Sequence, residues 1–256
     1  MKQFNEQDFA VLRKTLESGR QSPSMLGGVL ILSIIMTPIL FLITYIVMYD
    51  QSTYPYKDLL LEIHLYMSIL ICIFSILFAI PTIYRRFERI QYLIIIIVSQ
   101  NIFAWLPLVA CLFLIGKDPG MNTSDLIWLT IFCLIVGIII FAVTLIRFYG
   151  LLKKGAYRLG TSRDRNRSVL EDLVSKNKIT IILASVGLVY IIQFLIRSLD
   201  YLAIDTIVFS VIGLLIYFAM QFVLPEQLVM LYCKYKFESF NHNKKGGLKP
   251  MKVKRV

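Results

Sequence analysis

The sequence has few of the side chains that enzymes and metal sites require. It contains two histidines and four cysteines in 256 residues, and the cysteines form no CxxC pair. It also has no HExxH, GxSxG or Walker-type glycine motif. These absences argue against a zinc site, a redox motif and the common hydrolase or nucleotide-binding chemistries. We therefore expect a protein that is not an enzyme and that has no metal ion or other cofactor.

Charged residues are also scarce. They make up 17% of the chain, and hydrophobic residues make up 57%, whereas soluble domains average about 25% and about 45–50%. A helix needs about 20 apolar residues to cross the hydrocarbon core, and continuous apolar runs favour helices over barrel strands. The sequence therefore predicts an all-α integral membrane protein with six transmembrane helices. They are expected at residues 25–49, 59–84, 90–116, 126–148, 179–199 and 205–226.

The basic residues predict the orientation of these helices. Of the 27 Lys and Arg residues, 24 fall in segments that flank or separate the apolar runs on one side. Because basic residues beside spans stay on the cytoplasmic side, both termini are predicted to be inside, with short outer loops. We expect a multi-pass protein of the cell membrane. The heavy use of Ile, Lys, Asn, Tyr and Phe is compatible with an AT-rich bacterial genome, so the expected location is a bacterial plasma membrane. The four basic segments are 1–24, 85–91, 147–178 and 234–256.

The N-terminal segment 1–24 is predicted to be cytoplasmic and amphipathic. Asn5 is placed to cap a helix, and three apolar residues recur on one helical face before Gly19, which suits the position after a helix end. Such a helix would lie on the inner membrane surface or against the basic loop. The sequence Ser22-Pro23 then predicts the start of the first span. The three apolar residues are Phe9, Leu12 and Leu16.

The remaining segments are predicted to be cytoplasmic as well. Loop 149–178 is long and basic, with a flexible stretch over residues 155–167 and a helix that starts near Ser168, where a capping box begins. An interfacial helix is expected over 227–240, because Pro225 interrupts the last apolar run. Residues 241–256 contain six basic residues and no acidic one, together with Gly246-Gly247 and Pro250, which predicts a disordered tail.

Three adjacent polar residues near the middle of the third run form the first candidate site. Amides at this depth cost free energy unless they are paired, so they are expected to face the interior of the bundle. A polar notch beside Pro107 would line a substrate path, whereas hydrogen bonding between helices is the ordinary interpretation and the one we favour. The residues are Ser99, Gln100 and Asn101, with Gln193 of the fifth run as a possible partner.

Asp58, Glu62 and His64 form a second candidate site, an acidic rim at the outer end of the second run. A metal or ligand site would need such groups to converge from different helices. Solvated or hydrogen-bonded side chains are the more ordinary interpretation.

The third candidate site is the basic loop between the fourth and fifth runs. Clusters of four to eight basic residues beside a span attract anionic lipid headgroups, and the density here exceeds what orientation requires. We expect contacts with anionic lipids or with an acidic cytoplasmic protein. The residues are Lys153, Lys154, Arg158, Arg163, Arg165 and Arg167.

These features favour a non-enzymatic membrane subunit of an accessory, immunity or other partner-binding type, which acts through its spans and its basic face. The alternative is a permease-like or lipid-translocating protein that uses the Ser99–Asn101 notch. The expected partners are membrane lipids, including anionic ones, and another protein or a second copy of the chain. Nucleic acid is not expected, because no folded domain is left to recognise it.

Overall fold

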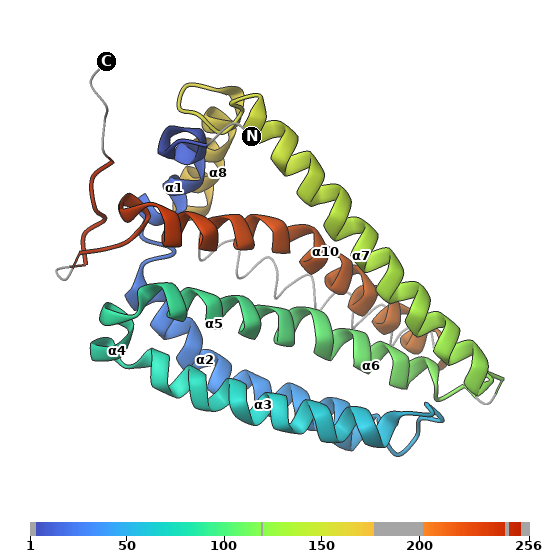
Figure 1. Ribbon diagram of the computed structural model, residues 1–256. Helices are drawn as coiled ribbons and strands as arrows, with labels where there is room; N and C mark the ends of the chain where they lie inside the picture. Colours follow the sequence, from blue (N-terminus) through green and yellow to red (C-terminus); the bar gives the residue numbers. More distant parts are fainter. Residues whose placement is uncertain (1–3, 119, 177–201, 244–245, 252–256) are drawn as a thin grey trace.

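A computed structural model of the protein describes residues 4–118, 120–176, 202–243 and 246–251, and its regular elements are helices (Figure 1). The fifth predicted span, 179–199, and its Gln193 lie outside the described residues. In chain order the helices are η1 (Glu6–Phe9), α1 (Ala10–Glu17), α2 (Pro23–Leu42), η2 (Ile43–Val47), α3 (Lys57–Ala79), α4 (Pro81–Arg86), α5 (Glu88–Gln100), η3 (Asn101–Trp105), α6 (Leu106–Ile115), α7 (Thr123–Lys153), α8 (Ser162–Lys176), α10 (Leu202–Lys236) and η4 (Glu238–Phe240).

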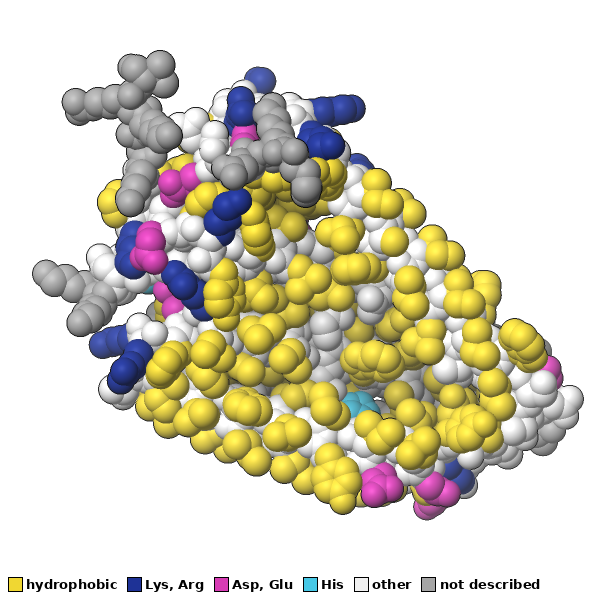
Figure 2. Space-filling model, viewed as in Figure 1, with side chains coloured by type: hydrophobic (Ala, Val, Ile, Leu, Met, Phe, Trp, Pro, Cys, Tyr) yellow, Lys and Arg dark blue, Asp and Glu magenta, His cyan; other side chains and the backbone are white. Residues whose placement is uncertain are grey.

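Five helices in the described part are long and apolar enough to cross a membrane, which fits a multi-pass α-helical membrane protein. Most of their large apolar side chains point outward, as expected where lipid is the solvent. Figure 2 shows this face covered by hydrophobic side chains, with Lys and Arg gathered where α1 and α8 lie. The five helices are Pro23–Val47, Lys57–Ala79, Glu88–Ile115, Thr123–Lys153 and Thr206–Lys236.

The helices depart from two of the predicted segments beside a proline. The second span ends at Ala79, because Ile80 precedes Pro81 and is extended, with ψ of 125°. The last helix does not stop before Pro225 but continues through it to Lys236. Spans tolerate an internal proline when neighbouring groups satisfy the freed backbone carbonyl. A separate interfacial helix after Pro225 is therefore absent from this part of the chain.

Small and polar side chains let the spans approach one another. On α2 and α3, Ser33 and Ser75 are buried, and their hydroxyl oxygens lie 3.1 Å apart. On α7, Gly137 leaves room for the Tyr217 ring of α10, which an added Cβ would overlap. Association of helices in lipid depends on such close packing and on hydrogen bonds between helices, since lipid tails are as apolar as leucine.

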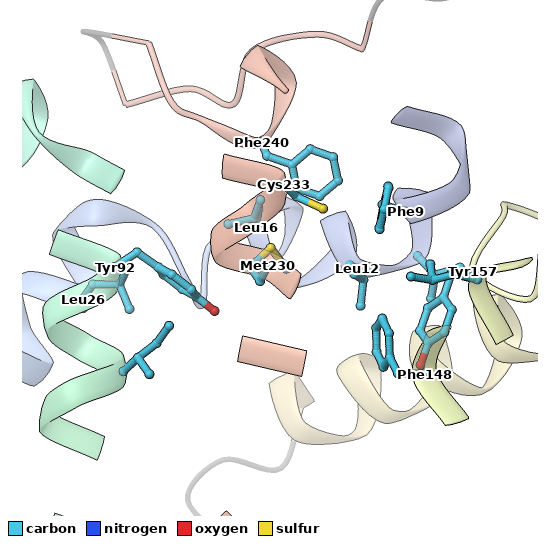
Figure 3. Close-up of a cluster of buried hydrophobic side chains, with 13 residues drawn as sticks. Phe9, Leu12, Leu16, Leu26, Tyr92, Phe148, Tyr157, Met230, Cys233 and Phe240 are labelled. Atoms are coloured by element: carbon cyan, nitrogen blue, oxygen red, sulfur yellow. The ribbon is translucent and has the colours of Figure 1, made fainter. Parts of the chain in front are cut away.

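The basic end of the bundle consists of α1, α4, α8, the start of α5, the ends of α7 and α10, and residues 237–243 and 246–251. Its hydrophobic core gathers Phe9, Leu12 and Leu16 of the N-terminal segment against Tyr157 and Met230 (Figure 3). Gly19 follows α1 with φ of 73°, the left-handed conformation expected after a helix end. The apolar face of α1 is thus covered by protein, which favours the predicted alternative that it packs against the basic loop.

Helix α8 begins at Ser162, six residues before the predicted start at Ser168. The hydroxyl of Thr161 accepts a hydrogen bond from the backbone N–H of Asp164, at 3.3 Å. The Asp164 carboxylate in turn accepts one from the N–H of Gly160, at 3.0 Å. The first bond satisfies one of the free donors in the first turn of the helix, and the second holds the residue before its cap. Residues 162–167, which the sequence predicts to be flexible, are therefore helical.

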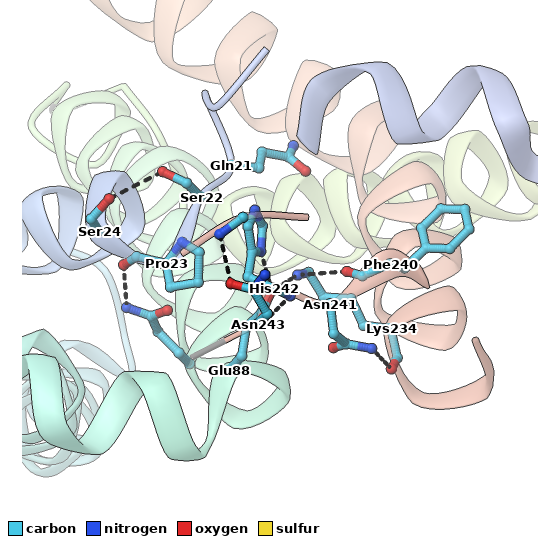
Figure 4. Close-up of polar contacts among 12 residues, drawn as sticks. Gln21, Ser22, Pro23, Ser24, Glu88, Lys234, Phe240, Asn241, His242 and Asn243 are labelled. Atoms are coloured by element: carbon cyan, nitrogen blue, oxygen red, sulfur yellow. Dashed lines mark hydrogen bonds and ion pairs between the residues drawn. The ribbon is translucent and has the colours of Figure 1, made fainter. Parts of the chain in front are cut away.

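The predicted disordered tail is instead ordered over residues 241–243 and 246–251. The backbone N–H of Lys249 donates to the carbonyl of Asn241 at 3.1 Å, and His242 pairs with Leu248 in a short antiparallel bridge. His242 also contacts Glu88, at the start of α5, through its backbone N–H and its Nδ1 atom (Figure 4). The prediction of disorder rested on composition, which contains no information on contacts between residues far apart in the sequence.

Candidate functional site

A hydrogen-bonded chain of three side chains lies inside the membrane-spanning part of the bundle. His64 of α3 is 8% exposed, Asn101 of η3 is 5% exposed and Tyr45 of η2 is 4% exposed. The Nε2 atom of His64 lies 2.8 Å from Oδ1 of Asn101. Its Nδ1 atom lies 3.0 Å from the hydroxyl oxygen of Tyr45. Three spans that are separate in sequence are thus joined by neutral polar groups.

Two of these three side chains come from π-helical segments. Tyr45 lies in η2 and Asn101 begins η3, where the N–H of Leu106 donates to the carbonyl of Asn101. Pro107 has no N–H, so the carbonyl of Phe103 loses its normal donor and the helix widens here. A widened turn rotates the following side chains relative to a regular helix, and such segments are frequent at functional sites.

The hydrogen-bond directions follow from the atoms. An amide oxygen only accepts, so Nε2 of His64 donates to Asn101. In the neutral imidazole, Nδ1 accepts from Tyr45. If the imidazole gains a proton, Nδ1 donates to the Tyr45 oxygen, and the hydroxyl can donate to the Leu60 carbonyl 3.2 Å away. His64 is therefore hydrogen-bonded in both protonation states.

A pocket of about 220 Å³ opens beside this chain of side chains, between α3 and the η3–α6 segment. Its rim carries the apolar side chains of Ile63 and Trp105, which are 54% and 51% exposed on the membrane-facing surface. Figure 2 shows a hollow in the hydrophobic face in which histidine is visible. His64 and Asn101 line the pocket, and Nδ2 of Asn101 is buried without a hydrogen-bond partner.

The other two residues of the predicted notch point to a different helix. Nε2 of Gln100 lies 3.5 Å from Oε1 of Gln227 on α10, and Nε2 of Gln227 lies 3.4 Å from the hydroxyl of Ser99. These contacts connect two helices, as in the ordinary interpretation of the notch. Asn101 alone of the three lines the pocket.

The predicted acidic rim is not a single site. Asp58 and Glu62 are exposed, and Asp58 accepts a hydrogen bond from the Tyr49 hydroxyl. His64 turns inward, away from both. The sequence does contain a signal for this, because His64 shares a helical face with Ser68 and the other buried residues of α3. Tyr45 was missed because no charge or motif distinguishes it.

The predicted basic surface is partly neutralised within the chain. Arg158 pairs with Asp8 at 2.7 Å, and Arg167 pairs with Glu226 at 2.8 Å. Arg163 donates to the hydroxyl of Tyr157. The remaining three predicted contact residues are exposed to solvent. They are Lys153, Lys154 and Arg165.

At the same end, Glu88 accepts from Lys234, whose side chain is 0% exposed, at 2.5 Å. The Nδ1 atom of His242 lies 2.9 Å from the same carboxylate oxygen. This cluster fixes the start of α5, the end of α10 and the tail relative to one another (Figure 4). Within the described residues, no group of three or more His, Cys, Asp or Glu side chains is placed to hold a metal ion.

Comparisons with protein-family models, with curated proteins and with solved structures find no match to this chain.

Proposed function

We propose that the protein is a permease-like membrane protein that binds an amphiphile from the surrounding lipid in the pocket beside His64 and Asn101. The observation that carries this proposal is that Asn101, whose Nδ2 atom is buried without a hydrogen-bond partner, is one of the polar residues that line a pocket with an apolar rim. A buried donor without a partner costs about 1–3 kcal/mol, and hydrocarbon offers no water to satisfy it. A ligand with a hydrogen-bond acceptor would remove that cost.

The size and chemistry of the pocket restrict the ligand. Its volume of about 220 Å³ is below the range of roughly 300–1,000 Å³ for drug-sized ligands. None of the described residues that line it is Lys, Arg, Asp or Glu. It therefore suits one short acyl segment with a neutral ester or hydroxyl oxygen, which would accept from Asn101.

Photolabelling tests the proposal. The probe is a monoacylglycerol that carries a diazirine near its ester, added to the purified full chain in lipid nanodiscs. We expect labelled peptides around Ile63 and Trp105, and competition by unlabelled monoacylglycerol. Asn101→Leu removes the donor, and Val109→Phe fills the pocket without removing a polar group. Both should reduce the competed labelling at least several-fold.

Gln100→Leu is the matched control, because it also removes one amide at this depth but outside the pocket. It should leave the labelling unchanged. Equal loss in Gln100→Leu and Asn101→Leu would instead assign the notch to helix packing. Movement of a fluorescent lipid in proteoliposomes, abolished by Val109→Phe, would support translocation as the activity.

A second candidate is the accessory, immunity-type or partner-binding subunit. The exposed Lys153, Lys154 and Arg165 favour it, because they extend into solvent beside a partly neutralised surface. The partner would be an acidic cytoplasmic protein or a second copy of the chain. Crosslinking from Lys153 in membranes should capture it, and replacing all three residues with Gln should abolish the capture.

The six-span arrangement with both termini in the cytoplasm of a bacterial cell is also our proposal, supported by the charge pattern. Single cysteines introduced at Thr53 and at Gly247, in a chain without other cysteines, test it. The proposed topology requires that an impermeant maleimide labels the first in intact cells and the second only after lysis. Labelling of both, or the reverse order, would contradict it.

A further inference from the structure

A second pocket, of about 240 Å³, lies at the basic end between α7 and α10. Arg147 and Arg163 line its polar part, and Phe148, Phe222 and Val223 line its apolar part. Phe222 and Val223 are exposed on a membrane-spanning helix. The pocket therefore adjoins both the hydrocarbon region and a layer of basic side chains.

Arg163 is fixed in position by the fold. One of its guanidinium nitrogens donates to the hydroxyl of Tyr157 at 2.8 Å, and its guanidinium carbon lies 5.0 Å from the centroid of that ring. Tyr157 is held in turn by Phe148, with ring centroids 4.7 Å apart. A guanidinium held in this way loses little side-chain entropy when it binds a further acceptor.

Arg147 has an unused guanidinium. It is exposed on α7, and none of the hydrogen bonds or ion pairs recorded between described residues involves it. The pocket's one carboxylate, Glu226, is already neutralised by Arg167, with 2.8 Å between nitrogen and oxygen. Two positive charges are thus left over at the mouth of an apolar groove.

Several charged residues around the pocket also act on the hydroxyl of Tyr157. Burial raises the pKa of the Tyr157 hydroxyl, and so does the charge of Glu226, whereas the charges of Arg163, Arg167 and Arg147 lower it. Arg147 and Arg163 both line the pocket. Arginine suits a phosphate, because its planar guanidinium can donate two parallel hydrogen bonds.

We propose that Arg147 and Arg163 bind the phosphate of an anionic phospholipid, with one acyl chain along Phe222 and Val223. Basic pockets between spans are known binding sites for such headgroups. This site uses none of the residues of the Asn101 pocket, so the two proposals are independent. It also differs from the surface expected from sequence, since Arg147 was not among the predicted contacts and Lys153 and Lys154 do not line the pocket.

The test is native mass spectrometry of the purified full chain with phosphatidylglycerol or phosphatidylcholine. We expect retention of one phosphatidylglycerol and little phosphatidylcholine. Each basic residue contributes about 1 kcal/mol, so Arg147→Gln should weaken retention about 5-fold, and Arg147→Gln with Arg163→Gln about 30-fold. Because Arg147 makes no hydrogen bond or ion pair with a described residue, the single variant should keep the fold and remains informative if the double variant does not fold.

The matched control is Lys153→Gln with Lys154→Gln, which removes the same charge from the same end of α7. It should change retention less than 2-fold. An equal loss in both pairs would show diffuse attraction and overturn the proposal, as would equal retention of phosphatidylcholine. Inorganic phosphate at millimolar concentration should not displace the lipid. If it displaces the lipid fully, the site binds free phosphate and the acyl-chain assignment is wrong.

Discussion

The basic end and the opposite half of the bundle bury polar groups in different ways. At the basic end, the buried cation of Lys234 lies against the carboxylate of Glu88. In the other half, the buried chain of Tyr45, His64 and Asn101 contains no carboxylate or Lys/Arg cation, and one of its donors is unpaired. This difference indicates which half of the bundle is expected to bind a ligand. Paired charges stabilise a fixed arrangement, whereas an unpaired neutral donor beside a pocket is a group that a ligand can satisfy.

Removing the carboxylate at the basic end should have the largest effect on stability. Glu88→Gln leaves Lys234 buried without its counter-charge, which costs about 3–5 kcal/mol. Thermal unfolding of the purified protein measures the loss. Arg89→Gln is the control, because it removes an exposed pair with Glu238 and a contact with the Tyr235 ring, and about 0–1 kcal/mol is expected for an exposed pair. Similar losses in both variants would contradict the contrast between buried and exposed pairs.

Breaking the neutral chain should cost less. His64→Leu leaves Oδ1 of Asn101 without its donor, which predicts a loss of about 1–3 kcal/mol. The hydroxyl of Tyr45 keeps the Leu60 carbonyl as an acceptor. In a double-mutant cycle of His64→Leu and Asn101→Leu, the second substitution should cost little once the first is made. Strict additivity would show that the two side chains do not act together.

Acid should destabilise the packing of the basic end more than it destabilises the hydrogen-bonded chain of Tyr45, His64 and Asn101. The hydrogen bond from Lys14 holds the pKa of Asp164 below its ordinary value, and the bond from Lys249 lowers the pKa of Glu238. A lowered folded-state pKa stabilises the fold above the ordinary pKa of about 4, and this contribution is lost as the pH falls below it. Hydrogen exchange in α1 and α8, measured relative to the intrinsic exchange rate at each pH, should therefore rise below about pH 4. Asp164→Asn should flatten this rise in α8; an unchanged rise would exclude Asp164 as its cause.

Local rules predicted the elements that depend on adjacent residues. Ser22 caps α2 with Pro23 in its first turn, as expected, and the apolar runs that the structure describes are helical. The prediction was wrong where distant residues decide the outcome. The ordered tail depends on Glu88. His64 was assigned to an outer rim by its neighbours in sequence, but Asn101 and Tyr45 hold it inside the bundle.

The candidate sites show the same limit. Sequence reasoning identified Asn101 as a polar group that should face protein, and its side chain is 5% exposed. It did not separate Asn101 from Gln100, because the π-helical turn that begins there decides which helix each side chain faces. The pairing of Arg167 with Glu226 joins residues far apart in the chain, so a count of basic residues overestimated the free charge of the loop.

The most direct test of the account is the side-chain amide resonance of Asn101 in the ¹⁵N-labelled protein, assigned with the Asn101→Leu variant. On addition of monoacylglycerol, the account predicts a downfield shift of the Asn101 side-chain N–H protons, as Nδ2 gains an acceptor, and no change at Gln100. Unchanged Asn101 resonances at saturating ligand would contradict it.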